Sequence, residues 1–214
     1  SELGPIQARV VTEALHDAGL PAGAFNVLLG RGADVGDEIA THPGIAKLSF
    51  TGSTPTGKLI ARAALDTMKR VSLALTGKSA SIVLDDADFA SALPLALNAA
   101  FMNNGQACVA GTRLLIPRAR MPEAIERIAA IATALRVGDP RDPATAIGPL
   151  LNAAQFERIQ RFIRRGKEQG ATLVAGGEGR PKGLSRGWYV RPTVFADVRN
   201  DMDIAREEIF GPVL

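Results

Sequence analysis

The only cysteine of the chain, Cys108, lies in the segment NNGQACVAGTR, residues 103–113. Glycine, asparagine and glutamine surround it, and these residue types favour a turn whose backbone N–H groups can face a ligand. A thiol in such a turn can be reached by an electrophile and can act as a nucleophile. A lone free cysteine is also often a small, inert, buried residue. The spacing alone leaves both interpretations open, because a catalytic cysteine requires partner residues.

A second stretch that could do chemistry is FTGSTPTGK, residues 50–58, where Gly52 and Gly57 flank hydroxyl residues in a strand-to-helix turn. Backbone N–H groups and the helix dipole at such a turn can bind phosphate. The spacing matches neither the GxGxxG dinucleotide fingerprint nor a P-loop, so an ordinary capped helix is the simpler interpretation. A similar glycine-rich turn, LLGRGADVG at 28–36, contains Gly32. Two such turns in neighbouring units favour a nucleotide crevice.

Strand-like and helical segments alternate along the chain, which predicts an α/β fold with parallel sheets and helical crossovers. Pro5 in a first turn and Gly19 as a closing cap bound the first helix, and an N-cap at Ser53 or Thr54 begins another. The predicted strands are 25–30, 46–50, 70–75, 80–84, 112–117 and 171–177. The other predicted helices lie within 33–42, 51–65, 87–103, 122–136 and 153–170.

The alternation restarts near residue 76, which predicts two domains, 1–76 and 77–214. Three carboxylates most simply cap the helix that follows them, and no histidine or cysteine lies near, so we expect no metal site: Asp85, Asp86 and Asp88. A basic cluster within 153–170 is more typical of a solvated helix face than of a phosphate site.

Composition excludes several classes of protein. The 25 basic and 22 acidic residues are mixed along the chain, which argues against a nucleic-acid partner despite the net charge of +3. No apolar run is long enough to span a bilayer, so we expect no membrane partner. A single cysteine rules out an internal disulfide and fits the reducing cytoplasm. Both ends read as internal to a longer polypeptide.

Six motifs, in this order, resemble the aldehyde dehydrogenase superfamily along essentially the whole chain: GSTPTG, LALTGKSASIVLDDADF, NNGQACVAGTR, VGDPRDPATAIGPL, GWYVRPTVF and EEIFGPV. Each motif is modest alone, but their order is highly specific. The resemblance implies that 1–76 is the C-terminal part of a Rossmann-like NAD-binding domain. It implies that 77–214 is the N-terminal part of an α/β catalytic domain, and that the chain is a central fragment that is not active alone.

The resemblance also implies roles for individual residues. Cys108 matches the thiolate that attacks a small-molecule aldehyde and ends as a thioester, with its own backbone N–H as half of the oxyanion site. Glu2 matches a carboxylate that binds the adenosine ribose, which favours NAD over NADP because a 2′-phosphate would meet like charge. Glu208 and Phe210 match the pair that holds the nicotinamide ribose and ring. The remaining expected cofactor-binding residues are Gly32, Gly52, Ser53, Gly57 and Leu75.

At residues 74–78 the family pattern is Glu-Leu-Gly-Gly-Lys, and this chain has Ala-Leu-Thr-Gly-Lys, so it differs at two positions. Ala74 occupies the place of the general base that activates water, and Thr76 adds bulk where the family has glycine. Hydrolysis of a thioester is therefore in doubt, and two alternatives stay open. A CoA-acylating enzyme would release the thioester to a thiol without that base, and a catalytically weak domain would serve cofactor binding or assembly. The full-length protein is expected to be a homo-oligomer.

Overall fold

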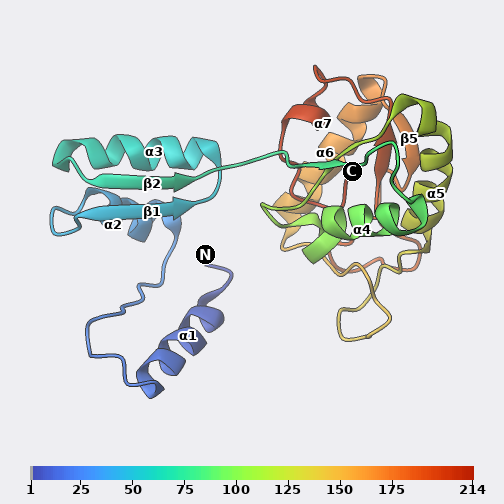
Figure 1. The fold of residues 1–214 in the computed structure, drawn as a ribbon. Helices are drawn as coiled ribbons and strands as arrows, with labels where there is room; N and C mark the ends of the chain where they lie inside the picture. Colours follow the sequence, from blue (N-terminus) through green and yellow to red (C-terminus); the bar gives the residue numbers. More distant parts are fainter. Residues whose placement is uncertain (1) are drawn as a thin grey trace. The chain divides into compact units, whose positions relative to one another are not determined.

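The computed structural model describes residues 2–214, which form two compact units (Figure 1). The first unit ends at Thr76, and the second comprises Gly77–Leu214. Both contain a pair of parallel strands joined by a helix, which confirms the predicted α/β class.

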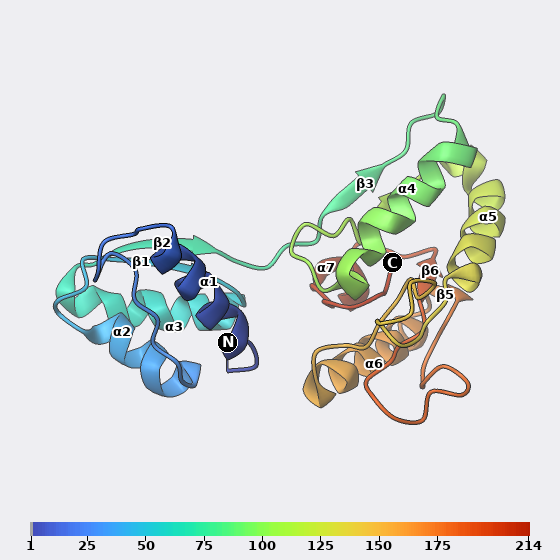
Figure 2. The ribbon, with the colours of Figure 1, turned by 90° about the horizontal axis from the view of Figure 1, so that it is seen from below.

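The first unit is built on two parallel strands, β1 (Lys47–Thr51) and β2 (Arg70–Ala74). Helices α2 (Asp37–Thr41) and α3 (Thr54–Ala64) lie side by side on one face of this pair (Figures 1 and 2). The small core between helices and strands contains Ala40, Leu48 and Ala64, all buried. The predicted helix over 33–42 is divided, because a π-helical turn (Gly32–Gly36) precedes α2.

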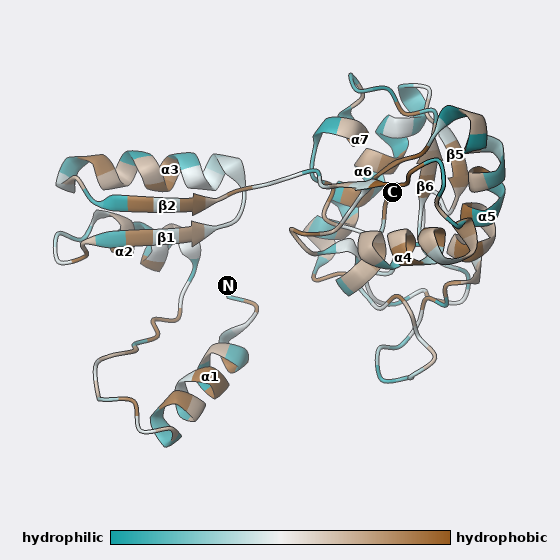
Figure 3. Cartoon of the chain, in the orientation of Figure 1, coloured by the Kyte–Doolittle hydropathy of each residue, from teal (hydrophilic) through white to brown (hydrophobic). Residues whose placement is uncertain are grey.

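The start of the first unit differs from the sequence-based prediction. Helix α1 (Pro5–Asp17) forms as expected, but none of its residues is buried, although Figure 3 shows apolar residues along it. The strand predicted over 25–30 is wrong. A strand requires a hydrogen-bonded neighbour, and none pairs with these residues in the described part of the chain. The side chains of Leu28 and Leu29 are 68% and 60% exposed.

Predicted helix starts are confirmed at two places. The Ser53 hydroxyl accepts a hydrogen bond from the Thr56 backbone N–H at 3.3 Å, so Ser53 caps α3. The Asp88 carboxylate accepts one from the Ala90 N–H at 3.0 Å and caps α4. Hydrogen bonds from Ala90 and Ser91 lower the pKa of Asp88 from its ordinary value.

The second unit contains a parallel pair, β3 (Ala80–Ile82) and β4 (Arg113–Leu115), and an antiparallel pair that was not predicted. The antiparallel strands β5 (Thr172–Ala175) and β6 (Val194–Ala196) are joined by a long loop without a helix. The α-helices of the second unit are α4 (Phe89–Phe101), α5 (Met121–Ala134), α6 (Ala153–Glu168) and α7 (Asp203–Arg206).

Two hydrophobic clusters hold this unit together. In the first, Leu93 and Leu97 of α4 pack with Ile128 of α5. In the second, Ile159 and Ile163 of α6 pack against the segments on either side of β6. All but Ile128 of these five are at most 1% exposed, so the second cluster fixes α6 firmly against the last residues of the chain.

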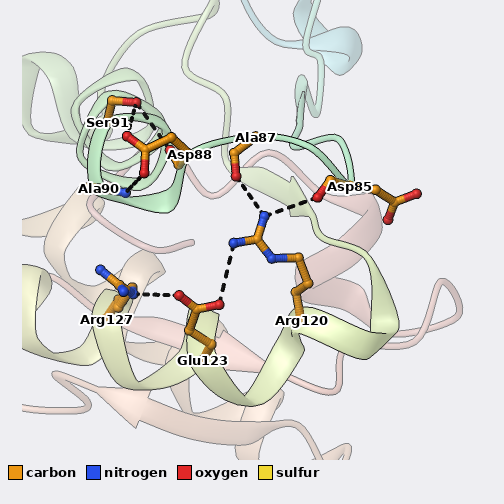
Figure 4. Close-up of polar contacts among 8 residues, drawn as sticks. All are labelled: Asp85, Ala87, Asp88, Ala90, Ser91, Arg120, Glu123 and Arg127. Carbon is orange, nitrogen blue, oxygen red and sulfur yellow. Dashed lines mark hydrogen bonds and ion pairs between the residues drawn. The ribbon is translucent and has the colours of Figure 1, made fainter.

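Arg120, just before α5, binds the segment that precedes α4 through hydrogen bonds (Figure 4). Its Nη1 donates to the backbone oxygens of Asp85 and Ala87 at 3.2 and 2.6 Å. Its guanidinium carbon lies 3.5 Å from the centroid of the Phe89 ring, and its Nη2 donates to Glu123 at 3.4 Å. One side chain thus orients α4, at whose far end the cysteine segment begins.

Candidate active site

The cysteine segment begins where α4 ends. Asn103, Asn104 and Gly105 have φ angles of 49°, 58° and 69°, a left-handed run that stops the helix. Asparagine and glycine are the residues that tolerate this region best. The reversal leads directly to Cys108, which is exposed. The interpretation of Cys108 as a buried residue is therefore wrong, while its role as a nucleophile stays a prediction.

Side-chain amides hold this segment in place. Asn104 accepts a hydrogen bond from the Gly148 N–H at 2.8 Å and donates to the Pro149 oxygen at 3.1 Å. Gln106 accepts one from the Leu151 N–H at 3.0 Å. The backbone N–H of Cys108 donates to no acceptor within residues 2–214. These amide side chains hold the turn in its shape, while the backbone N–H of Cys108 is left for another acceptor.

Gly105 brings the cysteine segment against the end of the chain. A Cβ atom at this position would collide with the backbone oxygen of Gly211, and Pro212 lies next to it. Only glycine permits this approach, which also requires φ of +69°. The residues after Phe210 therefore pack directly on the turn that carries Cys108.

Helix α6 holds Glu208 and Phe210 through their backbone oxygens. Arg158 Nη2 donates to the Glu208 oxygen at 2.6 Å, and Gln155 Nε2 donates to the Phe210 oxygen at 2.7 Å. Phe210 has a φ of 60° and its side chain is 36% exposed. A positive φ is rare for a bulky side chain, and such strain persists only where the surroundings enforce it. Helix α6 thus holds the backbone of both residues that are expected to contact the nicotinamide.

Lys78, Arg113 and Glu208 form a charged cluster in the second unit. Lys78 and Arg113 line a groove bounded by β4, α5 and β6. Burial lowers the pKa of Lys78 from 10.5 to about 8; Arg113 adds to this effect and Glu208 opposes it. Burial raises the pKa of the Glu208 carboxyl, and the cations Arg158 and Lys78 oppose this rise. The sequence motif did not identify Lys78 as a partner of Glu208.

We expect the free energy of unfolding to rise with pH between about 8 and about 10.5 because of Lys78. In that range the folded chain binds fewer protons at Lys78 than the unfolded chain does. Lys78→Met should remove this rise and stabilise the second unit at neutral pH. Urea unfolding at about pH 7 and about pH 9.5 measures the change in the free energy of unfolding. The exposed Lys182→Met is the control, and an unchanged pH dependence in Lys78→Met contradicts the assignment.

In the first unit, the proposed phosphate turn contacts the end of β2. The Gly52 N–H donates to the Ala74 oxygen at 3.0 Å. The Leu75 side chain packs on Gly57, where a Cβ atom would come within 2.5 Å of it. Gly52, Ser53, Gly57, Ala74 and Leu75 therefore lie together. Ala74 is the last residue of β2, and it is exposed.

Glu2 and Gly32 are not joined to this cluster by hydrogen bonds. Glu2 is exposed just before α1, and Gly32 begins the π-helical turn. Across residues 2–214, no hydrogen bond links either residue to Gly52 or Ser53. Their assignment to the cofactor site rests on the family resemblance alone.

Cations of the basic cluster of helix α6 are engaged in ion pairs with carboxylates. Arg164 and Lys167 both pair with Glu178, at 3.0 and 3.1 Å, and Arg165 pairs with Asp203 at 2.8 Å. These cations are exposed and already matched by carboxylates. Among the described residues, no group of three or more His, Cys, Asp or Glu side chains could hold a metal ion. No described helix has the length and apolar character that crossing a membrane requires.

Comparison with known proteins establishes the family. The model of the aldehyde dehydrogenase family matches residues 1–214, and the chain belongs to this family. A betaine aldehyde dehydrogenase from Rhizobium etli is 50% identical over 215 residues, which cover 100% of this chain and 44% of that protein. A putative aldehyde dehydrogenase from Staphylococcus saprophyticus is 42% identical over a match that covers 100% of this chain and 45% of that protein. The chain thus spans less than half the length of these curated relatives.

Solved structures agree with the fold. A mutant of aldehyde dehydrogenase C from Pseudomonas syringae, in complex with NAD+ and octanal, matches with a TM-score of 0.97 and 50% identity. The match covers 100% of this chain and 44% of that one. An aldehyde dehydrogenase from Mycobacterium tuberculosis, complexed with NAD+, matches with a TM-score of 0.94 and 46% identity. This match covers 98% of this chain and 43% of that one.

Sequence reasoning missed the residues that support the site. Gln155 and Arg158 reach Glu208 and Phe210 across about fifty positions, and nothing in the local pattern of α6 marks them. Their spacing of three residues places both on one helix face, which is the only signal the sequence offered.

Proposed function

We propose that this chain supplies the nucleophile and part of the cofactor site of an NAD-dependent aldehyde dehydrogenase. The observation that carries the proposal is the exposed Cys108, held on a left-handed turn with its own backbone N–H unpaired. A carbonyl that reaches the sulfur can place its oxygen at this N–H, as an oxyanion site requires. Family membership supports the aldehyde as substrate.

The reaction proceeds through sulfur chemistry. The Cys108 thiolate bonds to the carbonyl carbon and gives a tetrahedral thiohemiacetal. Loss of hydride from that carbon leaves a thioester on the sulfur; NAD, when bound, supplies the hydride acceptor. Cleavage of the carbon–sulfur bond by water then restores the thiol and yields a carboxylic acid. The turn holds the sulfur in place through these steps.

The residues of the first unit fit a dinucleotide. The Ser53 hydroxyl accepts from the Thr56 N–H, the Gly57 N–H donates to the Ser53 backbone oxygen, and Pro55 has no N–H, so within residues 54–57 the Thr54 N–H is left for a pyrophosphate. By the family resemblance, Glu2 would hold the adenosine ribose, with NADP the second choice, while Glu208 and Phe210 of the second unit are assigned to the nicotinamide half. Leu75 and Gly57 serve this site by packing the end of β2 onto α3.

Ala74 limits the last step, because a methyl group cannot take a proton from water. We therefore propose slow hydrolysis of the thioester, and activity that depends on segments which the relatives have and this chain lacks. A CoA-acylating reaction is the second candidate, and a weakly active domain for cofactor binding or assembly is the third. We further propose a cytoplasmic homo-oligomer as the working form.

The experiment uses a chimera in which this chain replaces the matching segment of the Pseudomonas syringae enzyme. NADH formation is followed with octanal and with betaine aldehyde, the compounds named for the relatives, with and without CoA. NADH that depends on aldehyde and disappears in Cys108→Ala supports the proposal. Stimulation by CoA selects the acylating reaction. NAD binding without any NADH leaves only the weakly active domain.

A further inference from the structure

Thr76 and Thr54 are 22 residues apart in the sequence, yet their hydroxyl oxygens lie 2.9 Å apart. Thr54 is the first residue of α3, and Thr76 is the second residue after β2. The family motif has glycine at the position of Thr76, and glycine cannot make this contact. The Thr76 side chain is thus directed to the start of α3.

This hydrogen bond is the last of three contacts made by consecutive residues onto one turn. Ala74 accepts a hydrogen bond from Gly52 at 3.0 Å, and Leu75 packs on Gly57. Thr76 adds the only side-chain hydrogen bond of the three. The third contact extends the attachment of this segment by one residue, to Thr76, which is hydrogen-bonded at the start of α3.

We propose that Thr76 is a positioning residue for the dinucleotide site. Through Thr54 it fixes the segment after β2 against the first turn of α3, so that the Thr54 N–H, which has no acceptor among the described residues, keeps one arrangement before the ligand arrives. This inference rests on the proposed function, which places a pyrophosphate at that turn. Thr76 touches Thr54 and acts through it. A turn held in its bound arrangement binds more tightly, because less ordering remains to be done on binding.

The test is a nuclear magnetic resonance titration of the isotopically labelled 214-residue chain with NAD. This method measures weak binding and also reports amide exchange. Thr76→Val should weaken NAD binding by about three- to tenfold, the range for one lost neutral hydrogen bond. Thr54→Val should weaken it equally, and the double variant no further, because both remove the same bond. Thr76→Ser should restore binding.

The matched control is Thr51→Val at the end of β1. The Thr51 hydroxyl makes no hydrogen bond within the described residues, so its loss should leave NAD binding unchanged. If Thr76→Val speeds amide exchange at the start of α3 but binds NAD like the unsubstituted chain, the contact is only structural and the inference fails. Equal weakening by Thr51→Val also overturns it. If the unsubstituted chain shows no NAD-induced shifts in its first unit, the proposed NAD site fails as well.

Discussion

Ala74→Glu should raise steady-state oxidation of aldehyde by the chimera by about 10²- to 10⁴-fold, the usual contribution of a positioned general base. The structure accommodates the larger side chain, because Ala74 is exposed at the end of β2. Its backbone is held by the hydrogen bond from Gly52, which does not depend on the side chain. The measurement is NADH formation under saturating aldehyde and NAD.

The gain should lie in release of the thioester. A single-turnover burst of NADH should therefore already occur with Ala74, and Cys108→Ala should abolish it. Thr76→Gly, which restores the residue of the family pattern, serves as a second substitution and is measured at saturating NAD, because loss of the contact with Thr54 should weaken NAD binding. The hydrolytic mechanism is contradicted if neither substitution changes turnover in water while CoA raises it with Ala74 in place. Ala74 would then be suited to thiolysis.

Gly105→Ala should destabilise the second unit by about 3 kcal/mol or more. Two costs add: a side chain at φ of +69°, which costs about 1–2 kcal/mol, and a clash with the backbone oxygen of Gly211. A backbone atom cannot rotate away as a side chain can, so Gly211 and Pro212 must shift. Urea unfolding of the 214-residue chain measures the loss.

Gly170→Ala separates these two costs. Gly170 has φ of +89°, and nothing lies within 4 Å of a Cβ atom there, so this variant carries the conformational cost alone. Gly105→Ala should be clearly less stable than Gly170→Ala, and its Cys108 should react with alkylating reagents at a changed rate. Equal stability of the two variants would show that the contact with Gly211 is not tight.

Features set by neighbouring residues could be predicted from the sequence. Ser53 and Asp88 cap helices because a side-chain oxygen two or three residues before a free N–H is a local arrangement. The turn at Asn103 and Asn104 followed from residue types that accept left-handed backbone. The exposure of Cys108 is consistent with that turn, so the sequence was informative about the surroundings of this thiol.

Features that depend on distant residues could not be predicted. Residues 25–30 have the composition of a strand, but composition does not provide a strand partner, and Phe25, Leu28 and Leu29 are exposed. The pKa of Lys78 depends first on its burial and then on Arg113 and Glu208, which lie 35 and 130 positions further along the chain. The contact between Thr54 and Thr76 required the strand order to be known first. These are tertiary interactions, which local patterns do not encode.

Helix α1 has a practical consequence for any handling of this chain. Thirteen residues are about the shortest length at which an isolated helix persists in water, and α1 has no buried residue to stabilise it further. Its helicity therefore depends on temperature and solvent rather than on either hydrophobic core. Proteases should cut the chain first near α1 and the exposed residues that follow, while α4 and α6 remain intact.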